Sequence, residues 1–72
     1  MPALPSVTVL VAAYQAERFV EAALESALAQ DYPADLLDVV VVNDGSSDRT
    51  GAIASAVAAR HPGRVRVVFQ QN

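Results

Sequence analysis

The chain has 72 residues, of which 53% are hydrophobic, and a formal net charge of −3. This length allows one small domain, and so high an apolar fraction in so short a chain indicates part of a larger core. The five basic residues are scattered arginines, which argues against a nucleic-acid-binding protein. No apolar run approaches the ~18 residues of a membrane span, and the absence of cysteine excludes disulfides and thiolate metal sites. We therefore expect a cytoplasmic protein.

The first part of the chain predicts a leader, a strand and a helix. Residues Met1 to Pro5 form the leader, because two prolines disfavour both helix and strand and no signal-peptide pattern is present. The run Val7 to Ala13 is apolar and rich in β-branched residues, which predicts a buried strand of a parallel sheet. Helical spacing follows over Ala16 to Gln30, with a core-facing stripe of Phe19, Val20, Ala23, Leu24, Ala27 and Leu28.

Three glutamates, Glu17, Glu21 and Glu25, lie four residues apart on the other side of this predicted helix. We interpret Glu21 and Glu25 as part of a solvated helix face. Glu17 differs from them because it lies in the first turn, close to the end of the first strand, where the helix dipole favours an acidic residue.

The second strand, predicted over Leu37 to Val42, contains four consecutive valines and is expected to be buried on both faces. Asn43, Asp44, Gly45 and Ser46 then favour a tight turn. Ser47 is predicted to cap a second helix, from about Asp48 to Arg60, with Thr50 three residues beyond the cap. The apolar face of this helix consists of Ile53, Ala54, Val57 and Ala58.

The last part of the chain predicts a helix end and a third strand. Pro62 and Gly63 stop the second helix, and His61 is interpreted as a helix-end histidine rather than a catalytic group. The third strand is predicted over Val65 to Phe69, at a sheet edge because arginines surround its start. The β-α-β-α-β order predicts a Rossmann-like α/β unit with a three-stranded parallel sheet and right-handed crossovers.

Two polar loops are predicted at the carboxyl edge of this sheet, where ligands bind in open α/β folds. Tyr14 follows the first strand and Asp44 follows the second. A tyrosine ring can stack on a base, and a carboxylate accepts hydrogen bonds from N–H groups or sugar hydroxyls. The bland alternative is a half-buried aromatic at a strand end and an acidic turn residue, and spacing alone leaves the two interpretations even. The common glycine-rich phosphate motifs are missing.

The segments SVTVLVAAYQAERFVEAALESALAQDYP and DVVVVNDGSSDRTGAIA resemble the opening of family 2 glycosyltransferases of the GT-A fold. That opening consists of a strand ending in P-x-Y-N-x-E, a helix closing on S-x-L-x-Q-x-Y-P and a strand ending in D-D-G-S-x-D-x-T. The resemblance covers Ser6 to Asn72. Three positions depart from it, namely Ala12, Gln15 and Asn43. The matching positions are Tyr14, Glu17, Ser26, Leu28, Gln30, Tyr32, Pro33, Asp44, Gly45, Ser46, Asp48 and Thr50.

The resemblance implies that residues 6–72 are the incomplete, nucleotide-binding first part of a GT-A nucleotide-diphospho-sugar transferase domain. The parent enzyme would be inverting and would transfer a sugar from an NDP-sugar, with a UDP-sugar expected, to an unknown acceptor. By position, Asp44 contacts the base and Tyr14 stacks near it, while Gly45 lies beside Asp44. The same resemblance implies that the backbone at Ala12 and Ala13 lines the pocket and that Glu17 supports its rim.

The family's metal-binding D-x-D motif, expected to hold Mg²⁺ or Mn²⁺, and its catalytic base lie downstream of this segment. No D-x-D occurs in the 72 residues, so the resemblance implies no metal or catalytic residue here and no transfer by this chain alone. In the full-length protein, the inner membrane face is a further possible location. The first strand would be an exposed apolar edge, which favours self-association. The alternatives are a non-enzymatic receiver-like or flavodoxin-like binding module, or a truncated fragment without a function.

Overall fold

The computed structural model describes residues 4–71 as one parallel sheet with helices between its strands. The elements in chain order are β1 (Val7–Ala13), α1 (Val20–Leu28), the short 3₁₀ helix η1 (Ala34–Leu36), β2 (Leu37–Asp44), α2 (Thr50–Arg60) and β3 (Val65–Gln70). The strands lie in the order β1-β2-β3, which confirms the predicted α/β unit. Residues 1–3 of the predicted leader, and Asn72 of the resemblance, lie outside the described residues.

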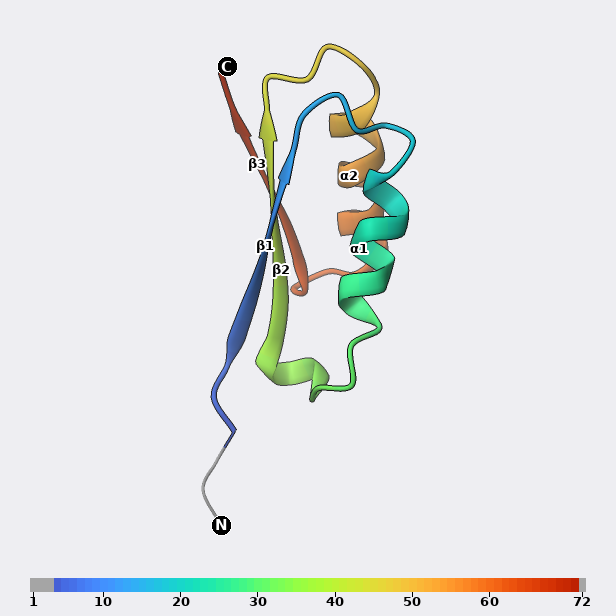
Figure 1. The fold of residues 1–72 in the computed structure, drawn as a ribbon. Helices are drawn as coiled ribbons and strands as arrows, with labels where there is room; N and C mark the ends of the chain where they lie inside the picture. Colours follow the sequence, from blue (N-terminus) through green and yellow to red (C-terminus); the bar gives the residue numbers. More distant parts are fainter. Residues whose placement is uncertain (1–3, 72) are drawn as a thin grey trace.

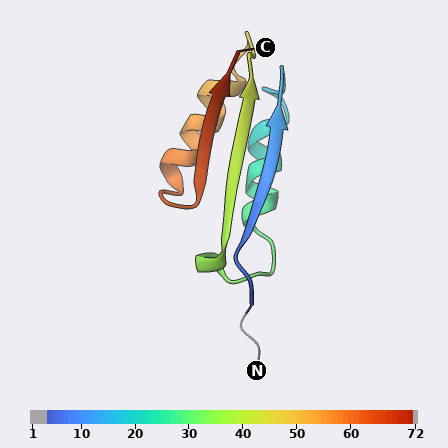
Figure 2. The ribbon, with the colours of Figure 1, turned by 90° about the vertical axis from the view of Figure 1, so that its left-hand side faces the viewer.

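Both helices cover the same face of the sheet (Figures 1 and 2). Right-handed crossovers produce this arrangement when each new strand is added on the same side of the previous one. Two rows of valines in register face the helices, Val9 with Val39 and Val65, and Val11 with Val41 and Val67. The core therefore lies in one layer between sheet and helices, with Leu24, Val39, Val41, Ala54 and Val57 fully buried.

The other face of the sheet carries no helix among residues 4–71 (Figure 1). Leu10, which pairs with Val40 on this face, is 68% exposed, and Thr8 and Ala12 are exposed beside it. The prediction that Val7–Ala13 is a buried strand is therefore wrong, because β1 has one strand neighbour and one covered face in the described chain. Burial on both faces holds for the centre of β2, where neighbours on both sides shield Val40.

Helix α1 begins at Val20, later than predicted. Phe19 is the N-cap residue, with φ −124° and ψ −21°, and its side chain is 69% exposed. The prediction that Phe19 and Ala23 belong to the core stripe is wrong, because Phe19 lies at the N-cap, before the helix begins, and the buried stripe is narrower than the predicted one. The buried stripe consists of Val20, Leu24 and Ala27.

Helix α2 has the predicted apolar face, with Ala54 and Val57 buried and Ile53 and Ala58 packed against the core. It begins at Thr50, and Arg49 occupies the N-cap position without a side-chain hydrogen bond. The prediction that Ser47 caps this helix is wrong, because Asp48 provides the acceptor for the Thr50 N–H at 2.9 Å. Strand β2 extends two residues beyond its predicted end, to Asp44.

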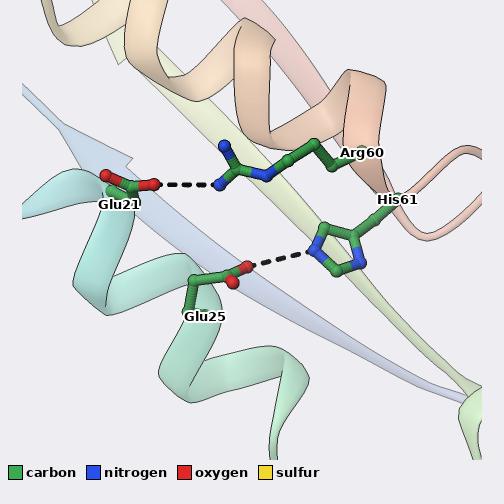
Figure 3. A network of polar contacts seen from close by, with 4 residues as sticks. All are labelled: Glu21, Glu25, Arg60 and His61. Carbon is green, nitrogen blue, oxygen red and sulfur yellow. Dashed lines mark hydrogen bonds and ion pairs between the residues drawn. The ribbon is translucent and has the colours of Figure 1, made fainter.

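An ion pair and a histidine–carboxylate contact join the two helices at their exposed sides (Figure 3). Arg60 contacts Glu21 at 2.9 Å, and Nε2 of His61 lies 3.1 Å from Glu25. The interpretation of Glu21 and Glu25 as a merely solvated face is therefore incomplete, because both reach the end of α2. His61 occupies the C-cap position of α2, which confirms that it is a helix-end histidine. Among residues 4–71, no helix is long and apolar enough to cross a membrane.

Candidate functional site

The candidate site lies where β1 and β2 end at the same edge of the sheet. Ala13 of β1 pairs with Asn43 of β2 in parallel register. Tyr14 and Asp44 are the next residues after this pair, so the register of the two strands places them side by side at the edge of the sheet. This placement confirms that the two polar loops leave the sheet side by side (Figure 1).

Asp44 is the last residue of β2 and is partly buried. It pairs in register with Gln70 of β3, and the Gln70 side-chain amide donates to Asp44 Oδ1 at 3.1 Å. This bond orients the carboxylate and leaves it capacity to accept further hydrogen bonds. Gly45 follows with φ 69°, a left-handed conformation that glycine adopts without strain.

Asn43 shapes the turn that follows β2. Its side chain is buried, with 5% exposure, and its Oδ1 accepts a hydrogen bond from the Ser46 N–H at 3.3 Å. An asparagine that bonds the backbone ahead of it in this way stabilises a turn. The departure from the family's aspartate at this position therefore retains an acceptor for the turn.

A set of hydrogen bonds, which we call the loop clasp, joins residues 15–17 after β1 to residues 46–50 after β2. The Gln15 N–H donates to Ser46 Oγ at 2.9 Å. In the other direction, Gln15 Oε1 accepts from the N–H groups of Ser47 at 2.6 Å and Asp48 at 3.4 Å. Sequence reasoning recorded Gln15 as a departure from the family pattern and missed this role.

The second half of the loop clasp is built on Asp48 and Thr50. Asp48 Oδ1 accepts from both the N–H and the hydroxyl of Thr50, and its Oδ2 accepts from the Glu17 N–H at 3.3 Å. The fully buried Thr50 hydroxyl oxygen accepts in turn from the Ala16 N–H at 2.7 Å. The hydrogen bond from the Thr50 hydroxyl is the largest of several that lower the pKa of Asp48 below its ordinary value of 3.8. Burial acts in the opposite direction and raises this pKa.

The remaining predicted site residues differ in how exposed their side chains are. Tyr14 is 56% exposed, which leaves much of its ring accessible. Ala12 is exposed, whereas the Ala13 side chain lies in the core, so Ala13 offers a ligand its backbone alone. Glu17 lies in the turn before α1 and contributes its backbone N–H to the loop clasp. Its exposed side chain is free to face solvent at the rim.

The residues of this edge do not form a metal centre by themselves. Within residues 4–71, no group of three or more His, Asp or Glu side chains gathers where it could hold a metal ion. The Asp48 oxygens already accept hydrogen bonds from Thr50 and Glu17. The donor set therefore does not fit a divalent metal, which needs several oxygen ligands.

The chain is similar to known glycosyltransferases. The family model described as "Glycosyltransferase like family 2" matches residues 5–72. Among curated proteins, the chain is 39% identical to the probable glycosyltransferase YdaM of Bacillus subtilis (strain 168) over 61 residues, which cover 85% of this chain and 14% of YdaM. It is 38% identical over 69 residues to the uncharacterized glycosyltransferase EpsJ of the same organism, covering 96% of this chain and 19% of EpsJ.

Among solved structures, the chain resembles mannosyltransferase PcManGT from Pyrobaculum calidifontis in complex with GDP-Man and Mn²⁺. The TM-score is 0.79 at 35% sequence identity, covering 94% of this chain and 19% of that one. The chain therefore belongs to the family 2 glycosyltransferases, as the resemblance implied. It spans about a fifth or less of the length of these relatives.

Proposed function

We propose that this chain is the nucleotide-binding portion, over residues 6–72, of an inverting glycosyltransferase that uses a nucleotide-sugar donor. The observation that carries the proposal is the placement of Tyr14 and Asp44 directly after the paired residues Ala13 and Asn43. Ligands of open α/β sheets bind at this edge, outside the carboxyl ends of the strands. Membership of the family supplies the substrate class.

The chemistry of the edge suits a nucleoside. The exposed Tyr14 ring offers a face on which a base stacks. The Asp44 carboxylate, oriented by Gln70, accepts a hydrogen bond from a base N–H or a ribose hydroxyl. Gly45 has no side chain and so allows the ligand a close approach to the backbone. In this proposal the backbone at Ala12 and Ala13 lines the pocket, and Glu17 supports its rim.

Uridine diphosphate is the first candidate nucleotide, as the family resemblance implies. Guanosine diphosphate is the second, because the similar mannosyltransferase structure contains GDP-Man. Uracil and guanine both present an N–H donor to a carboxylate at the position of Asp44. Direct competition between the two nucleotides therefore decides which donor class the edge selects.

Sugar transfer requires parts beyond these 72 residues. A divalent metal, Mg²⁺ or Mn²⁺, would neutralise the diphosphate leaving group when bound, and the similar mannosyltransferase structure contains Mn²⁺. Its ligands and the catalytic base would come from the longer protein. We therefore expect no sugar transfer by the purified 72-residue chain, and a radiolabelled-donor assay tests this directly.

The test of the proposed site is a titration of the chain with UDP and with GDP, followed by amide chemical shifts. We expect shifts at Tyr14, Asp44 and Gly45, and their loss in Asp44→Asn, which removes the charge and keeps an acceptor for Gln70. Asp31→Asn, in the exposed loop after α1, is the matched control because it makes the same change away from the edge. Folded protein that binds neither nucleotide would favour the non-enzymatic module instead.

We also propose that a second copy of the chain associates with the exposed edge of β1. This strand has one neighbour in the described sheet, and Leu10 is 68% exposed on its uncovered face. Unpaired apolar strand edges are templates for pairing with another chain. Sedimentation should show concentration-dependent association that Leu10→Lys weakens, and a monomer at high concentration would contradict the proposal.

A further inference from the structure

Gln15 has a backbone conformation that its residue type disfavours. Its φ of 51° is the one positive value at a non-glycine residue in the described chain. Every residue except glycine is strained in this left-handed region, and asparagine and aspartate tolerate it better than glutamine. The surrounding structure must therefore hold Gln15 in place.

The loop clasp provides what holds it. Gln15 Oε1 accepts from the Ser47 N–H, the Ser47 hydroxyl and the Asp48 N–H, at 2.6, 3.2 and 3.4 Å. The Gln15 N–H donates in the opposite direction, to Ser46 Oγ at 2.9 Å. Hydrogen bonds thus run both ways between two loops that are more than 30 residues apart in sequence. Loss of the Gln15 side chain would remove the shared acceptor of two backbone N–H groups.

The position of Gln15 connects the loop clasp to the candidate site. Tyr14 immediately precedes Gln15, and Ser46 follows Asp44 by two residues. Strand pairing fixes β1 as far as Ala13, through Asn43, and fixes β2 as far as Asp44, through Gln70 of β3. Beyond Ala13, the loop clasp determines the direction in which the backbone leaves Tyr14.

We propose that Gln15 is a positioning residue of the nucleotide site. Its side chain locks the loop after β1 onto the loop after β2 and so sets the spacing between Tyr14 and Asp44. This inference rests on the proposed nucleotide function. The amide oxygen of Gln15 does not contact the nucleotide, because three donors from Ser47 and Asp48 already occupy it. Gln15 therefore acts by positioning the loop.

The decisive variant is Gln15→Gly, because glycine tolerates the positive φ and deletes the acceptor. Hydrogen exchange should accelerate at the Ser47 and Asp48 amides by about tenfold or more, since these N–H groups lose their partner. The Kd for the better-bound of UDP and GDP should rise about tenfold, the loss expected for one or two hydrogen bonds. Chemical shifts of core residues such as Leu24 and Val57 should stay unchanged.

Two further variants separate the side chain from the backbone. Gln15→Glu keeps an oxygen acceptor at the same reach, so it should restore slow exchange at the Ser47 and Asp48 amides. Gln30→Ala is the matched control, because Gln30 bonds the Ser26 carbonyl at the end of α1, away from the loop clasp. If relief of backbone strain were the dominant effect, Gln15→Gly would instead slow the exchange of these amides.

The outcomes distinguish this inference from the proposed function. If wild-type chain binds a nucleotide and Asp44→Asn weakens it, but Gln15→Gly changes neither exchange nor affinity, this inference alone is overturned. Lost protection with unchanged affinity overturns it as well. A wild-type chain that is unfolded, or that binds neither UDP nor GDP, overturns both proposals. Joint loss of protection and affinity in Gln15→Gly, with rescue of protection by Gln15→Glu, supports the positioning role.

Discussion

Two polar networks join the first half of this chain to the second, and they differ in kind. The loop clasp pairs backbone N–H groups with side-chain oxygens, including the fully buried hydroxyl of Thr50. The ion pair between α1 and α2 connects two long side chains in solvent, with Arg60 51% and Glu21 58% exposed (Figure 3). The two networks cover similar separations in sequence, but only the loop clasp includes partly buried hydrogen bonds, namely those of Thr50.

This difference predicts that the Thr50 bonds of the loop clasp contribute to stability and that the exposed contacts between the helices contribute little. Leaving a buried backbone N–H without a partner costs the full desolvation of that group. Breaking an exposed ion pair returns both charges to water, so little is lost. The stability of a 72-residue chain is expected to be small. Loss of the acceptor of such an N–H should therefore lower the free energy of unfolding measurably, whereas loss of the exposed ion pair should barely change it.

The largest expected effect comes from Thr50→Val, which keeps the shape of the side chain and removes its hydroxyl. The Ala16 N–H loses its acceptor, and Asp48 loses a donor. We expect a loss of about 1–3 kcal/mol in the free energy of unfolding, measured by urea denaturation.

Thr8→Val is the matched control for this change. The Thr8 hydroxyl also bonds a carboxylate, Asp38 at 2.7 Å, but this hydrogen bond between β1 and β2 is exposed. Its effect should stay within about 0.5 kcal/mol, as is usual for surface substitutions. Equal losses in the two variants would contradict the distinction between buried and exposed polar contacts.

Gly51→Ala should perturb the turn after β2 from the side of α2. A Cβ at Gly51 would lie 2.7 Å from Asn43 Nδ2 and 2.9 Å from Phe69 Cε1. Overpacking of this kind costs about 1–3 kcal/mol, partly offset by the better helix propensity of alanine, so a net loss of about 1 kcal/mol is expected. The exposed Phe69 ring can rotate away, whereas Asn43 is buried and holds the turn.

Ser55→Ala, on the exposed face of α2, provides the control for helix propensity. It should be neutral or slightly stabilising, because it adds no contact. Displaced chemical shifts at Ser46 in Gly51→Ala alone would locate the disturbance in the turn. A Gly51→Ala variant as stable as Ser55→Ala would show that Asn43 and Phe69 move apart without cost.

Acid should weaken the loop clasp through Asp48. Its folded-state pKa is lowered below 3.8, first by the hydrogen bond from the Thr50 hydroxyl. A lowered pKa means that the carboxylate stabilises the fold fully above the unfolded-state pKa and that this contribution is lost as the pH falls through the folded-state pKa. The stability difference between wild type and Asp48→Asn should therefore shrink as the pH falls from about 5 to about 2. A difference that is constant over this range would contradict a charged Asp48 in the loop clasp.

The sequence predicts most strands and helices of this molecule well, because these elements follow from local patterns. Runs of β-branched residues predicted β1 with its observed bounds and the buried centre of β2, and helical spacing predicted the apolar face of α2. The joint motif also identified the family. These signals depend on neighbours within a few positions, which a single sequence displays directly.

The parts that failed depend on contacts between distant segments. Phe19 was assigned to the core because its spacing fits a helix, but it lies at the N-cap with its side chain 69% exposed. Gln15 was recorded only as a departure from the family pattern, although its amide oxygen accepts hydrogen bonds from residues more than 30 positions away. Glu21 and Glu25 could not be paired with the end of α2 before the packing of the helices was known. Periodicity carries no information about such pairings.

The smallest expected effect comes from the ion pair between Glu21 of α1 and Arg60 of α2. A double-mutant cycle of Arg60→Gln and Glu21→Gln should give a coupling of roughly 0.2–1 kcal/mol at low salt, as for other exposed pairs. The coupling should fall towards zero near 1 M salt, where the screening length is about 3 Å. The loss in Thr50→Val should persist under the same conditions, because salt does not screen the partly buried Ala16 N–H that loses its acceptor. A coupling that survives high salt would mean that the interface of α1 and α2 excludes water more than the exposure of Arg60 and Glu21 indicates.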